Sequence, residues 1–520
     1  MMTRRLALPG AVLLALVVVF VIAWGTRPGA TQGAVQGGQG AVVTSITRSC
    51  PPSAPGSAAG QISMVALPAQ AARAGSAASS GAAKPAVTPA GSATFSAVLA
   101  APAAAGGKPS GAGQASASSK ASASGTPSTK AKGTAPVTVS AAGAPATVTA
   151  PGGGGTAVAA TGRMAEGFEA EQSDASGTGL VSCTHPGADM WFVGTGQAAG
   201  AADVRLYLMN TGNLTASADV TILTDTGQVS GLRTAITVAP NQSVSENITP
   251  YVQGSQALAL HVQANTGQVA ASVWEGGKGG GAWLPQANAP ATSLVIPGLT
   301  VASSAARLFV VVPGATDAQL KVVAYTPAGA VTQFPGSPVD ASAGAATPLA
   351  LNSLGASAAG LKLTSNQPVV AGVLVPGTGI GSFTTAVPPI TEQGVVAGNP
   401  AARGVTVGLL LTAPSAAARA SISVIAADGS VMTPSGDQTV TVTARHTLAL
   451  AVPRPPGGGR DPFAIVITPQ PGSGPLYAVR VVTSGTGGLS APLSSLLPVA
   501  SAMTSITLPP AQDSYTAVLP

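Results

Sequence analysis

Charged side chains are scarce in this chain: Asp, Glu, Lys and Arg make up 8% of its 520 residues, and aromatic residues make up 3%. Long surface helices carry many charges, so this composition argues against a mainly helical protein. The chain instead has 66 Gly and 44 Pro residues, which favour strands, turns and linkers. The sequence therefore predicts a mainly β protein.

Acidic residues are absent from residues 1–165, which hold 11 Lys and Arg; the remaining residues hold 12 basic and 17 acidic side chains. A basic segment of this kind can contact anionic lipid head groups or anionic wall polymers, or it can simply keep a low-complexity stretch solvated. Aromatic residues do not interleave with these charges, so we expect no nucleic-acid partner.

Groups that carry catalysis are also few. The histidines are His185, His261 and His446, and the last two fall on expected strands. The sequence has no Gly-x-Ser-x-Gly elbow, and "GGKPS" and "GGKGG" lack the Ser or Thr that must follow the Lys of a phosphate-binding loop. No His or Cys stands at metal-ligand spacing from either cysteine. We predict a protein that is not an enzyme, with no catalytic residue, no cofactor and no metal.

The two cysteines, Cys50 and Cys183, predict a single disulfide, because an even cysteine count is typical of proteins in oxidising compartments. Closing so long a loop stabilises the fold by roughly 4–5 kcal/mol in the chain-entropy model. The alternative is two unrelated free thiols.

An uncharged run, Leu6 to Gly25, follows Arg4 and Arg5. Twenty helical residues span roughly 30 Å, the thickness of one hydrocarbon core, and the arginines direct the rest of the chain outward. We predict a signal-anchor helix within residues 1–27 and a single-pass cell-membrane protein with an extracytoplasmic C-terminal region. The alternative is a cleaved signal peptide and a secreted protein.

Residues 28–183 form an Ala-, Ser-, Gly- and Pro-rich region with short apolar stretches that alternate weakly. The tract 69–133 contains too little apolar surface to offset the entropy of ordering, which predicts a flexible tether. The short stretches around it predict a small irregular β-sandwich. A Cys50–Cys183 bridge would join its first strand to its last.

The region after Cys183 repeats itself. Val220, Val322 and Ile422 begin similar stretches, "VTILTDTGQV", "VVAYTPAGAV" and "ISVIAADGSV", which are 102 and then 100 residues apart. Apolar residues at every second position indicate strands with one buried face. The glycine of each stretch indicates a hairpin turn.

Six or seven short strands recur in each repeat, which is the pattern of a β-sandwich. We predict tandem Ig-like β-sandwich modules, and the alternative is a β-propeller built from paired blades. The expected boundaries are module 1 at 184–285, module 2 at 286–384, module 3 at 385–490 and closing strands at 491–520.

Two tryptophans are candidate binding residues. Trp191 lies in "CTHPGADMWFVGTG" beside Cys183, where it can stack on a sugar ring or anchor the core. Trp283 follows the glycine-rich stretch "EGGKGGGA" and is expected to be exposed. Trp274 aligns with the apolar Val375 and is expected in the core.

The cysteine-to-"WFVG" junction, made by Cys183, Trp191, Phe192, Val193 and Gly194, together with the repeats, resembles a family of uncharacterised actinobacterial proteins. The resemblance covers Cys50 to the C-terminus and implies an exported, membrane-anchored protein with a domain of unknown function. It implies no catalytic residues. We therefore expect a non-catalytic cell-envelope protein that binds or scaffolds envelope proteins or anionic wall polymers. The alternatives are a cell-wall carbohydrate-binding protein and an enzyme.

Overall fold

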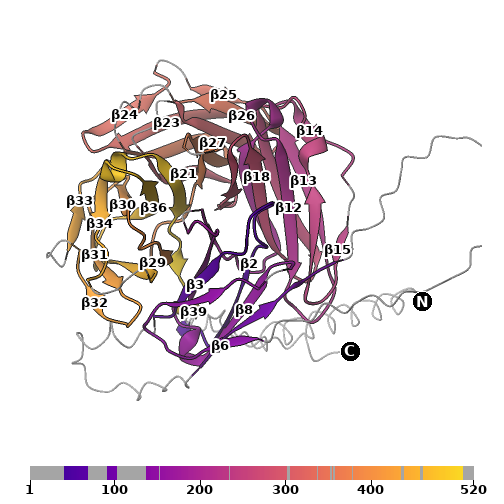
Figure 1. The fold of residues 1–520 in the computed structure, drawn as a ribbon. Coiled ribbons are helices and arrows are strands. Elements are labelled where there is room, and N and C mark those ends of the chain that lie inside the picture. Colours follow the sequence, from indigo (N-terminus) through magenta and orange to yellow (C-terminus); the bar gives the residue numbers. More distant parts are fainter. Residues whose placement is uncertain are drawn as a thin grey trace, which may run out of the picture. The chain divides into compact units, whose positions relative to one another are not determined.

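A computed structural model shows a mainly β protein (Figure 1). It describes residues 40–67, 91–101, 136–151, 153–177, 179–232, 235–300, 305–335, 338–351, 354, 358–377, 379–434, 439–456 and 461–507. The chain divides into two compact units. One contains Met1–Val42 with Ser505–Pro520, and the other is Val43–Thr504.

In the smaller unit, strand β1 (Gly40–Val42) pairs antiparallel with β39 (Ser505–Thr507). The expected anchor helix, Leu6 to Gly25, lies outside the described residues. Within the ranges that the structure does describe, no helix has both the length and the apolar character needed to span a bilayer. The helical segments found there are short 3-10 turns, such as η2 (Gly162–Met164), η3 (Gln197–Ala199), η4 (Thr249–Tyr251) and η6 (Gly488–Ser490).

The short stretches that surround the low-complexity tract form an N-terminal module of two sheets. One sheet has the order β10–β9–β3–β7 and the other β2–β8–β4–β6. Most of the tract 69–133 lies outside the described residues. The strands are β2 (Ser45–Cys50), β3 (Gln61–Val65), β4 (Ala93–Ala97), β5 (Leu99–Ala100), β6 (Val137–Val139), β7 (Ala146–Thr149), β8 (Thr156–Thr161), β9 (Glu169–Ser173) and β10 (Leu180–Ser182).

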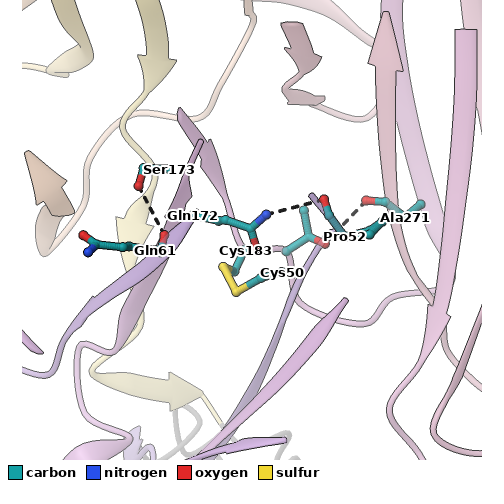
Figure 2. The surroundings of a disulfide bond; sticks show 8 residues. Cys50, Pro52, Gln61, Gln172, Ser173, Cys183 and Ala271 are labelled. Atoms are coloured by element: carbon teal, nitrogen blue, oxygen red, sulfur yellow. Dashed lines mark hydrogen bonds between the residues drawn. A yellow bond between two sulfur atoms is a disulfide. The ribbon is translucent and has the colours of Figure 1, made fainter. Parts of the chain in front are cut away.

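The predicted disulfide between Cys50 and Cys183 is present and joins β2 to the residue that follows β10, with the Cα atoms 4.2 Å apart (Figure 2). Beside it, the side-chain amide of Gln172 donates to the carbonyl oxygen of Pro52. Thr184, the residue after the disulfide, forms backbone hydrogen bonds in both directions with Ser49 of β2. The bridge therefore closes the N-terminal module.

Module 1 contains two sheets with the orders β14–β13–β17–β11–β20 and β19–β18–β12–β16–β5, and β15 pairs with β13. The second order includes β5 of the N-terminal module, which pairs parallel with β16. The strands are β11 (Asp189–Thr195), β12 (Asp203–Asn210), β13 (Ala216–Thr224), β14 (Gly227–Val229), β15 (Ile236–Val238), β16 (Gln242–Asn247), β17 (Ala257–Thr266), β18 (Ala270–Gly277), β19 (Gly280–Leu284) and β20 (Gln286–Ala287).

Module 2 repeats this arrangement, except that the long β27 belongs to both sheets. Its first half pairs with β23 and β21, and its second half pairs with β22 and β28. The strands are β21 (Ala291–Leu299), β22 (Arg307–Val312), β23 (Ala318–Thr326), β24 (Gly329–Gln333), β25 (Val339–Ala341), β26 (Ala345–Ala350), β27 (Ala359–Val375) and β28 (Ser382–Thr385).

Module 3 has the sheet orders β32–β31–β35–β29–β38 and β34–β30–β36–β37. Both β37 and β38 come from residues 491–520, so strands of this expected closing stretch complete the sheets of module 3. The strands are β29 (Gln393–Asn399), β30 (Val405–Ala413), β31 (Ala418–Ile425), β32 (Val431–Met432), β33 (Val440–Val442), β34 (His446–Val452), β35 (Phe463–Pro469), β36 (Tyr477–Ser484), β37 (Leu493–Pro498) and β38 (Ser501–Ala502).

The repeated turn is a hairpin in all three modules. Gly227, Gly329 and Gly429 have φ angles of 108°, 119° and 83°, a region that favours glycine. Each turn connects equivalent strands, β13 to β14, β23 to β24 and β31 to β32. The register predicted from the sequence holds in modules 1 and 2, where Ile222 pairs with Val229 and Ala324 with Val331, whereas in module 3 Val424 pairs with Met432, one residue further on.

The central strands bury both of their faces, whereas the sequence predicts one buried face. Strands β13, β23 and β31 alternate at their start as expected, but β11, β22 and β30 have continuous buried runs. The second face packs on a neighbouring module. Phe309 and Val311 of module 2 join the core of module 1, and Leu410 and Val479 of module 3 join that of module 2.

The N-terminal module packs on module 3 through Val65, which shares a core with Val395 and Ala464. The β5–β16 pairing joins the N-terminal module to module 1 as well. Within the larger unit, the N-terminal module therefore contacts both module 1 and module 3. No sheet in the described ranges closes on itself as a barrel or propeller.

Candidate functional site

Two cavities lie where all four modules converge. The first has a volume of about 500 Å³. Its wall contains loop residues of the N-terminal module, the β18–β19 hairpin of module 1, the start of β28 and the start of β37. Its lining residues include Pro55, Ser57, Gln172, Asp174, Asp203, Trp274, Gly281, Trp283, Ser382 and Ser494.

Aromatic rings form one wall of this cavity. Trp274 of β18 and Trp283 of β19 are cross-strand partners whose ring centroids lie 5.2 Å apart. The Trp283 ring also lies 5.7 Å from the ring of Tyr207. Gly281 permits this packing, because a Cβ atom at that position would overlap the Trp274 ring. Both indoles are half-buried, so each retains an exposed part.

Polar groups also line this cavity, Asp203 from module 1 itself, Ser382 from module 2 and Ser494 from the closing strands of module 3. Asp203 accepts from the Arg205 guanidinium at 3.0 Å, and the Ser382 hydroxyl oxygen accepts from the backbone N–H of Leu496 at 2.7 Å. Ser494 shares a hydrogen bond of 2.8 Å with Ser484. Hydroxyls and carboxylates that line the same cavity as indole rings are suited to a neutral, polar, ring-shaped ligand.

The second cavity has a volume of about 330 Å³ and mostly aliphatic walls. Apolar lining residues are Leu180, Val181, Phe192, Ala271, Leu284, Val387, Val395, Val396, Leu496 and Leu497. The charged or titratable residues that line it are Arg48, Glu169, Glu171 and His185. Trp283 lines both cavities, so it forms part of the wall that they share.

The charged groups of the second cavity are paired. The Arg48 Nη2 atom donates to Glu169 Oε1 at 2.6 Å. Burial raises the pKa of Glu169, against the opposing effect of the Arg48 charge. Burial, together with the Arg48 charge, lowers the pKa of His185. These shifts favour the protonated, neutral form of Glu169 and the deprotonated, neutral form of His185.

The two predicted binding tryptophans occupy different environments. Trp191 is 4% exposed and stacks on His261 of the neighbouring strand, with ring centroids 3.8 Å apart. His261 in turn contacts Asp189 at 3.0 Å. Trp191 therefore lies in the core of module 1, and Trp283 lies in a cavity wall. Trp274 also reaches this wall, although its alignment with Val375 suggested a core position.

Several charged residues at the site were not identified from the sequence. Glu169 and Glu171 are two residues apart on β9, a spacing that places both carboxylates on one face of the strand. Their partners, Arg48 and Arg480, lie 121 and 309 residues away. The spacing of the glutamates was a usable signal, but no local pattern indicates such distant partners. Among the described residues, no group of three or more His, Cys, Asp or Glu side chains is arranged to hold a metal ion.

Glu275 lies between the cavity-lining Trp274 and Gly276, but its own side chain is fully buried. Its carboxylate accepts hydrogen bonds from the backbone N–H and the hydroxyl of Thr195 at 2.9 and 2.8 Å. Burial outweighs these bonds and raises the pKa of Glu275 to about 8. The folded state thus keeps this carboxyl protonated near neutral pH.

This pKa shift predicts a pH-dependent stability. The folded pKa of Glu275 exceeds the ordinary value of 4.5. The protonated Glu275 side chain therefore contributes fully to the free energy of unfolding below pH 4.5, and this contribution is lost as the pH rises to about 8. The free energy of unfolding should fall by roughly 3 kcal/mol between about pH 5 and about pH 8 on this account. Glu275→Gln should flatten the fall in urea titrations. Parallel pH profiles for the two proteins would contradict the assignment.

Comparison with known proteins identifies a family. Residues 138–453 match the sequence profile described as Family of unknown function (DUF5719), which covers more than half of the chain. No curated protein matches the sequence. Among solved structures, an α-L-rhamnosidase of Streptomyces avermitilis complexed with L-rhamnose is similar at 11% identity, with a TM-score of 0.10 over 61% of this chain. The match covers 49% of the rhamnosidase, so the chain spans about half of its length. This similarity is too low to indicate a shared fold.

Proposed function

We propose a non-catalytic binding role for this chain, which belongs to the family of unknown function DUF5719. It acts in the cell envelope, where its β modules form a scaffold and the first cavity binds a wall saccharide. The observation that carries the proposal is the cavity of about 500 Å³ with Trp274 and Trp283 in its wall. Indole faces stack on sugar rings, and the facing hydroxyls and carboxylates bond to sugar hydroxyls.

The proposed location is extracytoplasmic. The Cys50–Cys183 disulfide supports it, because such bonds persist in oxidising compartments. The uncharged run Leu6 to Gly25 would anchor the chain as a single transmembrane helix, with secretion after signal cleavage as the alternative. The abundance of Ala, Val, Gly and Pro fits a protein of actinobacteria or similar organisms.

The proposed scaffold is a set of β-sandwich modules that share cores with their neighbours. Apolar side chains of one module enter the core of the next, as Phe309 of module 2 does in module 1. Such shared cores resist relative movement of the modules better than polar interfaces do. A cavity wall built from four modules would then keep a fixed shape, which lowers the entropy lost when a ligand binds.

A pull-down with purified wall polysaccharide tests the function. Wild-type chain should be retained, and Trp283→Ala should weaken retention about tenfold because one of the two indole rings in the cavity wall is lost. Leu214→Ala is the matched control, since Leu214 is 75% exposed and does not line either cavity. This control should be retained like the wild type.

Three results would contradict the proposal. If the wild-type chain is not retained, the wall polysaccharide does not contain its ligand. Retention that is unchanged by Trp283→Ala places the contact elsewhere. Polysaccharide that is recovered in shortened form shows that the chain is an enzyme, which the proposal denies.

A further inference from the structure

The sheet that contains β12, β18 and β19 carries the indoles of the first cavity and a carboxylate on the same face. Trp274 pairs with Arg205 on one side and with Trp283 on the other. Two residues along each strand, Gly276 pairs with Asp203. Residues two apart in a strand point to the same side of a sheet, so the Asp203 side chain lies on the face that carries the indoles.

Gly276 leaves a gap between Asp203 and the indole of Trp274. A Cβ atom at position 276 would lie 3.3 Å from Trp274 Nε1 and 3.5 Å from Asp203 Cβ. The backbone of Gly276 is not in the left-handed region, so the chain conformation does not require a glycine there. The missing side chain instead leaves space between a carboxylate and an indole N–H, and all three residues line the first cavity.

The groups on either side of this gap are complementary in hydrogen bonding. The Asp203 carboxylate accepts from the Arg205 Nε atom with both of its oxygens, each at 3.0 Å. Each oxygen has a further lone pair, and the Asp203 side chain is 34% exposed, so the carboxylate can also accept from a ligand. The indole N–H of Trp274 can only donate. Two neighbouring hydroxyls fit such a gap, because a hydroxyl both donates and accepts.

The charges around the first cavity oppose an anionic ligand. Its charged lining residues are Asp174 and Asp203, and none of the described residues in its wall is Lys, Arg or His. The Arg205 guanidinium is held by Asp203, and Lys278 of the β18–β19 hairpin is exposed and lies outside the cavity wall. A phosphate or carboxylate on the ligand would therefore meet carboxylates in this wall without a basic partner.

We propose that the first cavity recognises a neutral sugar through two neighbouring hydroxyls, which bond to Asp203 and Trp274 Nε1 across the gap at Gly276. Asp203 sets the specificity, because it accepts from hydroxyls and repels phosphate and carboxylate groups. This inference rests on the proposed saccharide function and names the class of saccharide. The anionic polymers of the wall are then not the ligand of this cavity.

Neutral and anionic fractions of wall polysaccharide, separated by anion exchange and immobilised, are the probes for the full chain. The neutral fraction should retain the wild-type chain at least about tenfold more strongly than the anionic fraction. Periodate cleaves the carbon–carbon bond between neighbouring hydroxyls, and borohydride then reduces the aldehydes that form. The neutral fraction treated in this way should retain the chain about tenfold more weakly, because the proposed pair of hydroxyls is lost.

Variants of the gap test the same contact from the side of the protein. Asp203→Asn should weaken retention on the neutral fraction about threefold to tenfold and strengthen retention on the anionic fraction, because it removes a negative charge and releases the Arg205 guanidinium. Gly276→Ala should weaken retention on the neutral fraction about tenfold, because its methyl group fills the gap. The matched control is Asp340→Asn, an exposed residue that lines neither cavity, and it should behave like the wild type.

Four results would each overturn the inference: equal retention by the two fractions, undiminished retention by the periodate-treated fraction, unchanged retention of Gly276→Ala, or equal losses on both fractions by an Asp203→Asn chain that unfolds at the wild-type urea concentration. If Asp203→Asn does not fold, the periodate comparison decides, since it needs no variant. The saccharide function itself survives these results as long as Trp283→Ala weakens retention. A wild-type chain that neither fraction retains contradicts both proposals.

Discussion

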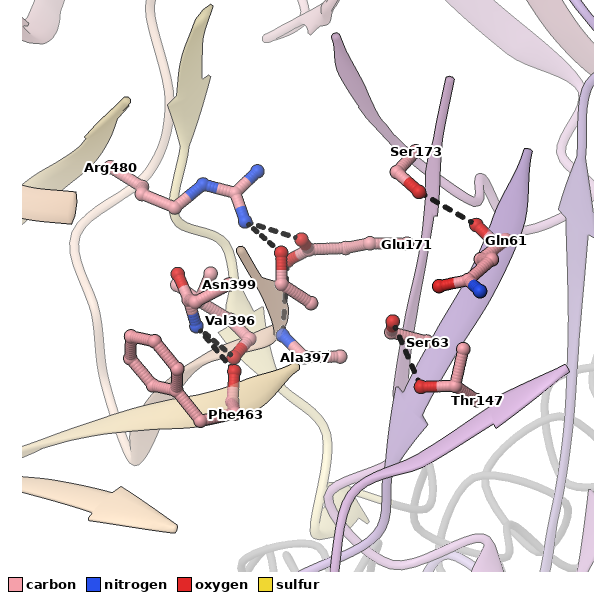
Figure 3. Close-up of polar contacts among 11 residues, drawn as sticks. Gln61, Ser63, Thr147, Glu171, Ser173, Val396, Ala397, Asn399, Phe463 and Arg480 are labelled. Atoms are coloured by element: carbon pink, nitrogen blue, oxygen red, sulfur yellow. Dashed lines mark hydrogen bonds and ion pairs between the residues drawn. The ribbon is translucent and has the colours of Figure 1, made fainter. Parts of the chain in front are cut away.

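Glu171→Gln should lower the free energy of unfolding by roughly 3–5 kcal/mol, the usual cost of removing one partner from a buried ion pair. The Arg480 side chain is fully buried, and its Nη1 atom lies 2.7 Å from Glu171 Oε2 (Figure 3). Nη1 also donates to the carbonyl oxygen of Gly398 at 2.9 Å. Glutamine would leave the guanidinium without an anion in the protein interior.

The position of this pair adds to its importance. Glu171 belongs to β9 of the N-terminal module, and Arg480 belongs to β36 of module 3. The second oxygen of Glu171 accepts from the backbone N–H of Ala397 on β29. One carboxylate thus contacts two strands of another module, so its loss should loosen the contact between the modules as well as leave a buried charge unpaired.

Urea denaturation of the full chain measures the effect. Asp340→Asn is the control, because Asp340 is exposed and its loss should change stability by less than about 0.5 kcal/mol. A second variant that combines Glu171→Leu with Arg480→Met should recover much of the loss, since it removes both charges together. If Glu171→Gln unfolds at the wild-type urea concentration, the ion pair does not stabilise the contact between these modules.

Removing the disulfide, by Cys50→Ala with Cys183→Ala, should destabilise the chain by roughly 4–5 kcal/mol in the chain-entropy model. The two cysteines are 133 residues apart and both are buried. The unfolded chain without the bridge gains the freedom of that long loop. Alanine leaves no unpaired polar atom behind, so the effect reports mainly on the bridge.

Denaturation with and without a reductant checks this prediction. The reduced wild type should match the double variant, and the reductant should have no effect on the double variant itself. Equal stability of the oxidised wild type and the double variant would show that the bridge is not a stabilising element of the N-terminal module.

The repeated modules could be predicted from the sequence because their signals are local. Gly227, Gly329 and Gly429 mark equivalent hairpins, and Val220, Val322 and Ile422 lie on equivalent strands. Strand periodicity and turn glycines depend on neighbouring residues, so they can be recognised in the sequence without a structure. The Cys50–Cys183 bridge was predictable for another reason, since the chain has only two cysteines.

The packing between modules was not predictable in the same way. Strand β22 has the sequence "RLFVVV" and is apolar at nearly every position, but this sequence does not indicate which module covers the second face of the strand. Trp274 shows a related problem. Its alignment with Val375 correctly places it on an equivalent strand, yet the β18–β19 hairpin brings it to a cavity wall beside Trp283. The cavities depend on contacts between distant segments.

Hydrogen exchange of the full chain, with and without purified wall polysaccharide, shows whether a saccharide binds where the modules meet. We expect added protection in segments of different modules that contribute residues to the wall of the first cavity: residues 53–60, 172–176, 179–181, 274–283 and 494–496. These segments are far apart in the sequence, so joint protection would locate the ligand where the modules meet. If protection is absent from these segments, or is confined to surface loops outside the cavity, the first cavity is not the saccharide site.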